Sequence, residues 1–139
     1  MSKIKVIKLS PMKAPEVVFI ENTLEAMQEF VGGYIQVVYP YEDRVAIVGD
    51  DEGKLKHYKP TRILFGEDGE PYDMLVGDCF IVGLSQHNFD SVPDELVEKY
   101  VEKFRYPELI YRFAGSVYMK RIGCEEDPVC IYDGSRANG

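Results

Sequence analysis

The sequence predicts an α+β domain in which two helices pack on a mostly antiparallel sheet. Two stretches repeat apolar residues at helical spacing, and several short runs alternate apolar with polar residues, as half-buried strands do. The chain has 139 residues, and single domains typically hold about 100–150. Apolar residues make up 45% of the chain and charged residues 29%, which is typical of globular proteins. A chain of this size can form a core without metals or disulfides.

The first two expected strands lie near the N-terminus. Apolar residues alternate with lysines in Lys3–Leu9, and an apolar run lies between the glutamates of Glu16–Glu21. Pro11 and Pro15 interrupt the pattern between them and indicate a turn. We therefore expect these two strands to pair as a hairpin.

A helix is expected directly after this hairpin. Asn22 is a suitable N-cap, and Glu25 three residues later resembles a capping box. Gly32 and Gly33 end the helical pattern, because glycine readily adopts the left-handed conformation that closes many helices. The apolar stripe consists of Leu24, Met27, Phe30 and Val31. The strands on either side of this helix could also run parallel, with the helix as their crossover.

The middle of the chain alternates short strands with turns. Pro60 should break a short segment that follows the acidic turn at residues 50–53. The most apolar run is expected to be the central strand. The expected strands cover residues 34–39, 44–48, 63–65 and, for the central strand, 78–84, with a polar loop at 66–71.

A second helix is expected after residue 90. Ser91 should cap it, Pro93 suits its first turn, and Asp94 favours its positive end. Pro107 should end it. Its apolar face comprises Leu96, Val97, Tyr100, Val101 and Phe104.

Two β-like stretches follow the second helix, at residues 109–113 and 117–120, with a turn at Gly115. From residue 123 the chain becomes polar and is expected to fray. We therefore divide the chain into a core at 1–90, a helix plus aromatic β-like extension of the same domain at 91–122, and a polar tail at 123–139.

Charge and hydropathy exclude several classes of protein. The 16 basic and 24 acidic residues give a net charge of −8, and residues 41–78 hold ten acids against five bases. Such a surface repels phosphates, so direct binding of nucleic acid is not expected. No apolar run approaches the roughly 20 residues that span a membrane, and the N-terminus has no apolar signal core. We expect a cytoplasmic protein without a membrane partner.

The reactive side chains indicate neither an enzyme nor a metal site. Cys79 lies in an apolar run and is expected to be a buried hydrophobe, while Cys124 and Cys130 are expected to stay reduced. The two histidines lack metal-ligand spacing. Phosphate-loop, dinucleotide-binding and serine-hydrolase motifs are missing. We expect no catalytic activity, no cofactor and no metal.

Four segments resemble a known family. They are the helix-Gly-Gly-Tyr-Ile block at 22–35, Asp51-Glu52-Gly53-Lys54-Leu55, Pro60-Thr61-Arg62 and Val76-Gly77-Asp78. Together they resemble DUF3846, a family of small uncharacterised domains found in phages, plasmids and conjugative elements, over about residues 3–90. The resemblance implies an α+β fold and a mobile-element origin but supplies no activity. Many members have asparagine where this chain has Thr61.

A ligand pocket is the first candidate site. Arg62 offers a planar fork for phosphate or carboxylate, Lys59 a point charge, and Tyr34 a stacking face. If the turn at Pro60 folds beside the glycine pair, these residues would line one anion pocket. The candidate residues are Gly32, Gly33, Tyr34, His57, Lys59 and Arg62. The alternative is a helix C-cap with surface charges around it.

An aromatic surface is the second candidate site. Aromatic residues are dense near the C-terminus, and tyrosine and phenylalanine supply much of the energy of protein interfaces. Some of them must pack in the core, and any surplus marks an oligomer contact or a partner surface. The interface candidates are Tyr106, Tyr111, Phe113 and Tyr118.

Three functions follow from these features. The leading hypothesis is a non-enzymatic accessory protein of a phage or mobile element that binds a protein and blocks or sequesters a component of host defence. The second is a binder of a small, nucleotide-like anion. The third is an acidic mimic of DNA. A homodimer is expected in each case, because twofold pairs are common among soluble proteins.

Overall fold

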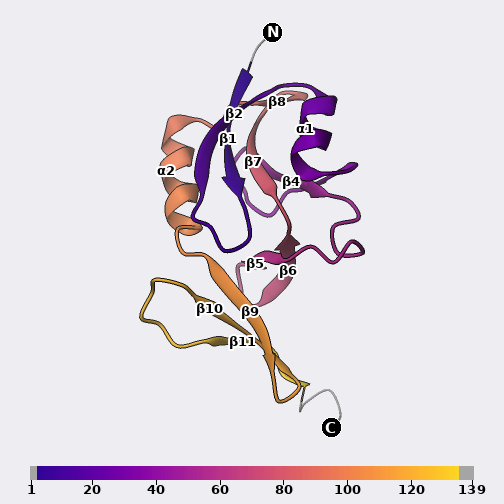
Figure 1. The fold of residues 1–139 in the computed structure, drawn as a ribbon. Coiled ribbons are helices and arrows are strands. Elements are labelled where there is room, and N and C mark those ends of the chain that lie inside the picture. Colours follow the sequence, from indigo (N-terminus) through magenta and orange to yellow (C-terminus); the bar gives the residue numbers. More distant parts are fainter. Residues whose placement is uncertain (1–2, 135–139) are drawn as a thin grey trace.

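The computed structural model describes residues 3–134 and has a mixed fold with one six-stranded antiparallel sheet. Five strands follow the order β2-β1-β7-β4-β3, and β8 pairs with β7. The α+β prediction is therefore confirmed (Figure 1). The six strands are β1 (Lys3–Leu9), β2 (Glu16–Glu21), β3 (Ile35–Val38), β4 (Val45–Asp50), β7 (Cys79–Ser85) and β8 (Asn88–Asp90).

The expected hairpin and central strand are confirmed. β1 pairs antiparallel with β2, so Val6 lies opposite Val18. β7 lies between β1 and β4, where Ile81 is opposite both Ile7 and Ile47. Four antiparallel steps separate β2 from β3, so these two strands point in the same direction. They lie at opposite edges of the sheet, and the first helix crosses between them.

The two helices cover opposite faces of this sheet (Figure 1). They are α1 (Leu24–Val31) and α2 (Asp94–Lys103). Two expected caps are corrected. Thr23, not Asn22, caps α1, and its hydroxyl accepts from the amide of Ala26 at 3.1 Å. Pro93 is the cap position of α2, while the Ser91 hydroxyl accepts from the Lys5 amide in β1.

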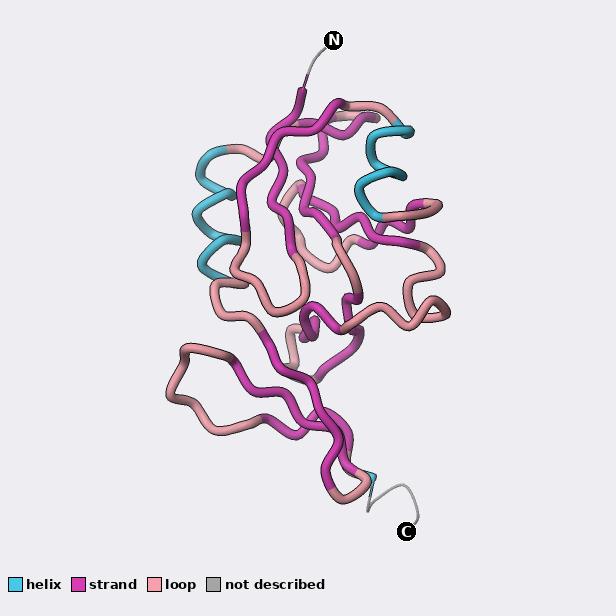
Figure 2. Tube along the Cα trace, viewed as in Figure 1, coloured by secondary structure: helices cyan, strands magenta, loops and turns pink. Residues whose placement is uncertain are grey.

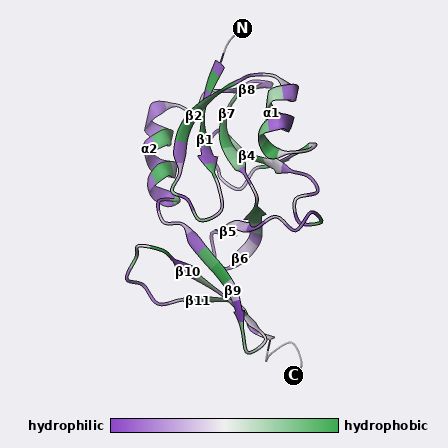
Figure 3. Ribbon diagram, in the orientation of Figure 1, coloured by the Kyte–Doolittle hydropathy of each residue, from purple (hydrophilic) through white to green (hydrophobic). Residues whose placement is uncertain are grey.

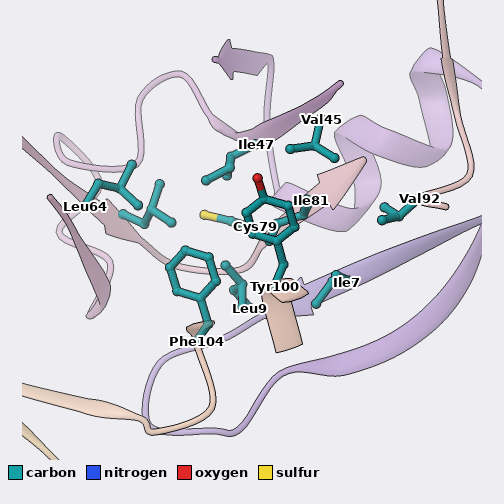
Figure 4. Packing of buried hydrophobic residues seen from close by; sticks show 11 residues of the cluster. Ile7, Leu9, Val45, Ile47, Leu64, Cys79, Ile81, Val92, Tyr100 and Phe104 are labelled. Atoms are coloured by element: carbon teal, nitrogen blue, oxygen red, sulfur yellow. The ribbon is translucent and has the colours of Figure 1, made fainter. Parts of the chain in front are cut away.

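Alternation along the strands divides the core between the two helices. Val6 faces α1 and Ile7 faces α2, because successive strand residues point to opposite sides. Figure 3 shows hydrophobic residues concentrated on β1, β4 and β7 between the helices. The α2 side, seen in Figure 4, includes Leu9, Val45, Ile47, Leu64, Cys79, Ile81, Val92, Tyr100 and Phe104. The α1 side comprises Ile4, Val6, Met27, Val31, Ala46, Val48, Phe80 and Val82.

A two-stranded sheet lies below the main sheet, and only part of it was expected from the sequence. It consists of β5 (Pro60–Phe65) and β6 (Pro71–Val76). Pro60 is the first residue of β5 and does not end a preceding strand. β6 and β8 were not expected from the sequence pattern. Ile63 of β5 lies opposite Met74 of β6. The Ile63 amide donates to the carboxylate of Glu108, and the Met74 amide donates to the carboxylate of Asp73. Both amides therefore have a carboxylate as acceptor.

A three-stranded sheet follows α2 and projects from the rest of the molecule (Figure 2). It contains β9 (Glu108–Phe113), β10 (Ser116–Arg121) and β11 (Val129–Tyr132). β11 corrects the expectation that the chain frays from residue 123, because it pairs with β10. The final part of the expected tail, residues 135–139, lies outside the described residues. Neither helix within residues 3–134 has the length and hydropathy to span a membrane.

Candidate functional site

The four segments that carry the family resemblance meet at one corner of the molecule. The Lys56 ammonium donates to the carbonyl of Gly32 at 3.1 Å. The amide of Asp51 donates to the carbonyl of Tyr34 at 2.8 Å, and the amide of Gly77 donates to that of Lys59 at 2.9 Å. Two of these bonds join the glycine turn to the acidic turn, the third joins the two sides of the β5–β6 hairpin, and Tyr58 packs against Gly32, Gly53 and Gly77 between them. We refer to this region as the glycine corner.

An ion pair between a buried aspartate and an exposed lysine lies at the centre of the glycine corner. Only 2% of the Asp50 side chain is exposed, and its carboxylate is 2.7 Å from the Lys56 ammonium. Burial acts to raise the pKa of Asp50, but hydrogen bonds from Lys56 and the Glu52 amide outweigh it and lower the pKa. The hydrogen bond to Asp50 raises the pKa of Lys56. Both groups are therefore charged near neutral pH.

The glycines of this corner leave room for these side chains. A Cβ on Gly33 would lie 2.7 Å from the Lys56 ammonium and 2.9 Å from the Asp50 carboxylate oxygens. A Cβ on Gly77 would lie 2.5 Å from the Tyr58 ring. Gly32 also has a φ of 91°, which non-glycine residues rarely adopt. Close packing thus accounts for glycine at positions 33 and 77, and the backbone conformation accounts for Gly32.

The expected role of Arg62 as a ligand-binding residue is corrected. Arg62 is fully buried, with 0% of its surface exposed. Its guanidinium donates to four backbone carbonyls, those of Ser10 at 3.5 Å, Lys13 at 2.7 Å, Thr61 at 2.8 Å and Phe104 at 3.0 Å. The fork that we expected to bind an anion therefore holds together the β1–β2 turn, β5 and the end of α2.

The other candidate residues divide between two cavities instead of lining one. Gly32 and Lys59 share a cavity of about 370 Å³ with the rings of Phe30 and Tyr58. Gly33 and Tyr34 line a second cavity of about 270 Å³ beside Asp50 and Lys56. Tyr34 is 72% exposed. His57 lines neither cavity and has a left-handed backbone with a φ of 60°.

The sequence pattern did not predict the structural roles of Asp50 and Tyr58 in the glycine corner. The sequence pattern predicts that Asp50 begins a tight acidic turn, whereas the structure places it at the end of β4. The alternation along β4 indicates that Asp50 is buried, because Asp50 shares a strand face with the buried Ala46 and Val48. Tyr58 gave no such signal, since two of the glycines around its ring, Gly32 and Gly77, lie in distant parts of the sequence.

Three of the four predicted interface residues lie on one face of the β9–β11 sheet. Tyr111 and Phe113 are two positions apart on β9, and Tyr118 lies opposite Tyr111 on β10. The rings of Tyr111 and Tyr118 stack with centroids 5.7 Å apart. Leu109 continues the row, and both Leu109 and Phe113 are exposed. We call Leu109, Tyr111, Phe113 and Tyr118 the outer aromatic face.

The opposite face of this sheet is turned toward the rest of the protein. It carries the buried Glu108 and Met119, and Glu108 accepts from the Ile63 amide of β5 at 2.7 Å. Tyr106, the fourth predicted interface residue, precedes β9. The Arg105 guanidinium lies 5.4 Å from the centre of its ring. Tyr106 therefore lies outside the row of side chains on β9 and β10.

The acidic middle of the chain is partly neutralised by lysines. Asp43, Asp50 and Asp73 form ion pairs with Lys99, Lys56 and Lys54 at 2.6 to 2.7 Å. These carboxylates belong to different turns and strands, so they do not act as a row of free negative charges. Within residues 3–134, no three histidine, cysteine or acidic side chains gather as a metal-binding group.

Comparison with known proteins gives one family. The model of the domain of unknown function DUF3846 matches residues 4–105, which extends beyond the resemblance at 3–90 and includes α2. The searches of curated proteins and of solved structures found no match. The matched region contains the main sheet, both helices and the glycine corner, whereas the β9–β11 sheet follows it. This chain therefore belongs to the family of domains of unknown function DUF3846.

Proposed function

We propose that this protein acts by binding a protein partner through the outer aromatic face. The observation that carries the proposal is the row of Leu109, Tyr111, Phe113 and Tyr118 on the outward side of the β9–β11 sheet. Aromatic side chains supply large contact areas and are enriched at the energetic centres of protein interfaces.

The shape of the sheet supports this role. The β9–β11 sheet extends away from the main body, so a partner can approach its outer face (Figure 2). Its inner face is fixed to β5 through Glu108, which limits the entropy lost when a partner binds. The aromatic row is therefore presented on an anchored scaffold.

The partner we propose is a component of host defence. This choice rests on the resemblance to domains of phages, plasmids and conjugative elements. In this setting the protein would block or sequester the component without performing chemistry on it.

Affinity capture from an extract of the natural host tests the proposal. The wild-type protein should retain a partner in stoichiometric amount, whereas Phe113→Asp should lose it, because a carboxylate would replace an apolar contact surface. Phe19→Asp is a matched control, since Phe19 is also exposed but lies on β2. Equal retention by Phe113→Asp and wild type would refute the proposal.

The cavity that Gly32 and Lys59 share favours a second candidate function, the binding of a small anion. It has a volume of about 370 Å³, and its lining includes Lys59, the aromatic residues Phe30 and Tyr58, and Asp78. A planar anion such as a nucleoside monophosphate could stack on a ring and place its phosphate near the ammonium.

Thermal unfolding with nucleoside monophosphates tests this second function. A ligand at one hundred times its dissociation constant should stabilise the fold by about 2.7 kcal/mol. Lys59→Ala should remove this effect, and Lys3→Ala should leave it unchanged. The second function is rejected if no nucleotide stabilises the protein or if Lys59→Ala retains the full shift.

A further inference from the structure

β3 forms one edge of the main sheet, and its outer side has no strand partner within residues 3–134. The Asp51 amide donates to the Tyr34 carbonyl, so Tyr34 and Asp51 form a hydrogen-bonded pair in the β3–β4 ladder. In an antiparallel ladder the direction of the backbone groups alternates along each strand. Ile35 and Val37 therefore direct their amides and carbonyls away from β4, where another strand can pair with them.

The edge at β3 carries no charge. Residues 34–39 read Tyr-Ile-Gln-Val-Val-Tyr, and the tyrosines at the two ends are 72% and 64% exposed. The opposite edge differs, because β2 begins with Glu16 and ends with Glu21. Charges at edge strands oppose pairing between copies of a protein, and β3 lacks them.

We propose that two copies of the chain associate by antiparallel pairing of β3 with β3 of the second copy. The twofold axis passes beside Gln36, so Gln36 faces Gln36 of the second copy and Ile35 faces Val37 of the second copy. In this register, the outward amides and carbonyls of Ile35 in each copy form hydrogen bonds with those of Val37 in the other copy. A shift by one residue would place these outward groups opposite residues whose amides and carbonyls point back toward β4. The two main sheets become one continuous sheet with a closed, symmetric contact.

The surrounding charges agree with this pairing. β3 itself brings no charged side chain into the contact. Pairing of β2 with β2 of a second copy would instead bring four glutamates into one contact. Like charges directly opposite each other destabilise strand pairs.

Sedimentation of the full-length chain over a concentration series tests the proposal. We expect reversible formation of a dimer by the wild type. Gln36→Lys should raise the dimer dissociation constant at least about tenfold, because it places two ammonium groups at the axis. Gln36→Glu should do the same, and an equimolar mixture of the two variants should restore the dimer. Phe19→Lys, on the β2 edge, should dimerise as the wild type does.

A disulfide measures the register directly. Gln36 and its counterpart form a non-hydrogen-bonded pair, whose Cα atoms lie about 4.5 Å apart and can be bridged by a disulfide. In a Cys124→Ser, Cys130→Ser background, Gln36→Cys should yield a covalent dimer on mild oxidation, whereas Phe19→Cys should form no covalent dimer.

Two results would refute the proposed β3 dimer. A wild-type monomer at every concentration excludes the dimer. A dimer that resists Gln36→Lys and Gln36→Glu excludes β3 as the contact, and loss of that dimer in Phe113→Asp would assign it to the outer aromatic face. The proposed partner binding does not depend on β3, so partner capture by a Gln36→Lys monomer separates the two proposals.

Discussion

At the scale of single residues, Arg62 shows how a charged side chain can act as a structural element. Its carbonyl partners lie in the β1–β2 turn, in β5 and at the end of α2. A guanidinium has five donors in a planar arrangement, so one side chain can serve several carbonyls that would otherwise be buried without partners.

Arg62→Lys should destabilise the protein by roughly 2–4 kcal/mol, because one ammonium cannot reach all these carbonyls and buried acceptors are left unpaired. Urea unfolding followed by circular dichroism measures the loss. Arg112→Lys is the control, since Arg112 is exposed on β9 and should change stability by less than about 0.5 kcal/mol. Equal midpoints for the two variants would contradict the assigned role of Arg62.

Cys79 is a second residue whose surroundings determine its chemistry. Burial, together with the charges of Asp78 and Asp50, raises the pKa of the Cys79 thiol to about 12. A thiol must ionise to react, so Cys79 should be inert in the folded protein at pH 8. A colorimetric thiol assay should count two reactive thiols in the native protein and three in denaturant. Three rapidly reacting thiols in the native protein would disprove this prediction.

At the scale of elements, Glu108 anchors the β9–β11 sheet to the β5–β6 sheet. Its carboxylate accepts from the Ile63 amide at 2.7 Å, in a region that also contains the buried Met119. Burial raises the pKa of Glu108, although the Ile63 hydrogen bond and the charge of Arg62 oppose the shift. The hydrogen bond to Ile63 needs an oxygen acceptor and does not require a charge.

Glu108→Ala should cost about 1–3 kcal/mol, because it leaves the buried Ile63 amide without an acceptor. Glu108→Gln should be much milder, since the amide oxygen can still accept this bond. Urea midpoints of the two variants provide the comparison. The proposed anchor would be refuted if the glutamine variant lost as much stability as the alanine variant.

At the scale of the whole molecule, ion pairs connect elements that are distant in the chain. Lys5 of β1 pairs with Asp94 of α2, and Asp43 accepts from both Lys99 and Tyr100. Hydrogen bonds from these partners lower the pKa values of Asp43 and Asp94, and hydrogen bonds from Lys56 and the Glu52 amide lower that of Asp50. The folded state therefore binds protons less readily at three aspartates than the unfolded state does.

A group whose pKa is lowered by folding stabilises the protein above its unfolded pKa and loses this effect as the pH falls. Stability should therefore decrease as the pH falls below the ordinary aspartate value of 3.8. The raised pKa of Glu108 acts in the opposite sense but is one group against three. Urea midpoints from pH 6 to pH 3 test this, and Asp50→Asn should flatten the profile. A midpoint independent of pH would contradict it.

The elements with strong local patterns were predictable from the sequence. Alternation identified β1, the most apolar run identified β7, and helical spacing identified α1 and α2. The aromatic row was also predictable in part, because Tyr111 and Phe113 are two positions apart on one strand. β6 and β11 were missed because short strands with polar or irregular patterns become recognisable only when a partner strand pairs with them.

The sequence by itself determined the α+β class, both helices and the most apolar strands, because these depend on periodic burial along one segment. Tertiary contacts determined which of the charged and polar candidate residues are buried and which are exposed. Arg62 became a buried tether and Asp50 the centre of the glycine corner, while Tyr34 stayed at the surface. Whether a charged or polar side chain is buried depends on which partners reach it, and the carbonyls that bind Arg62 come largely from residues 42 to 52 positions away.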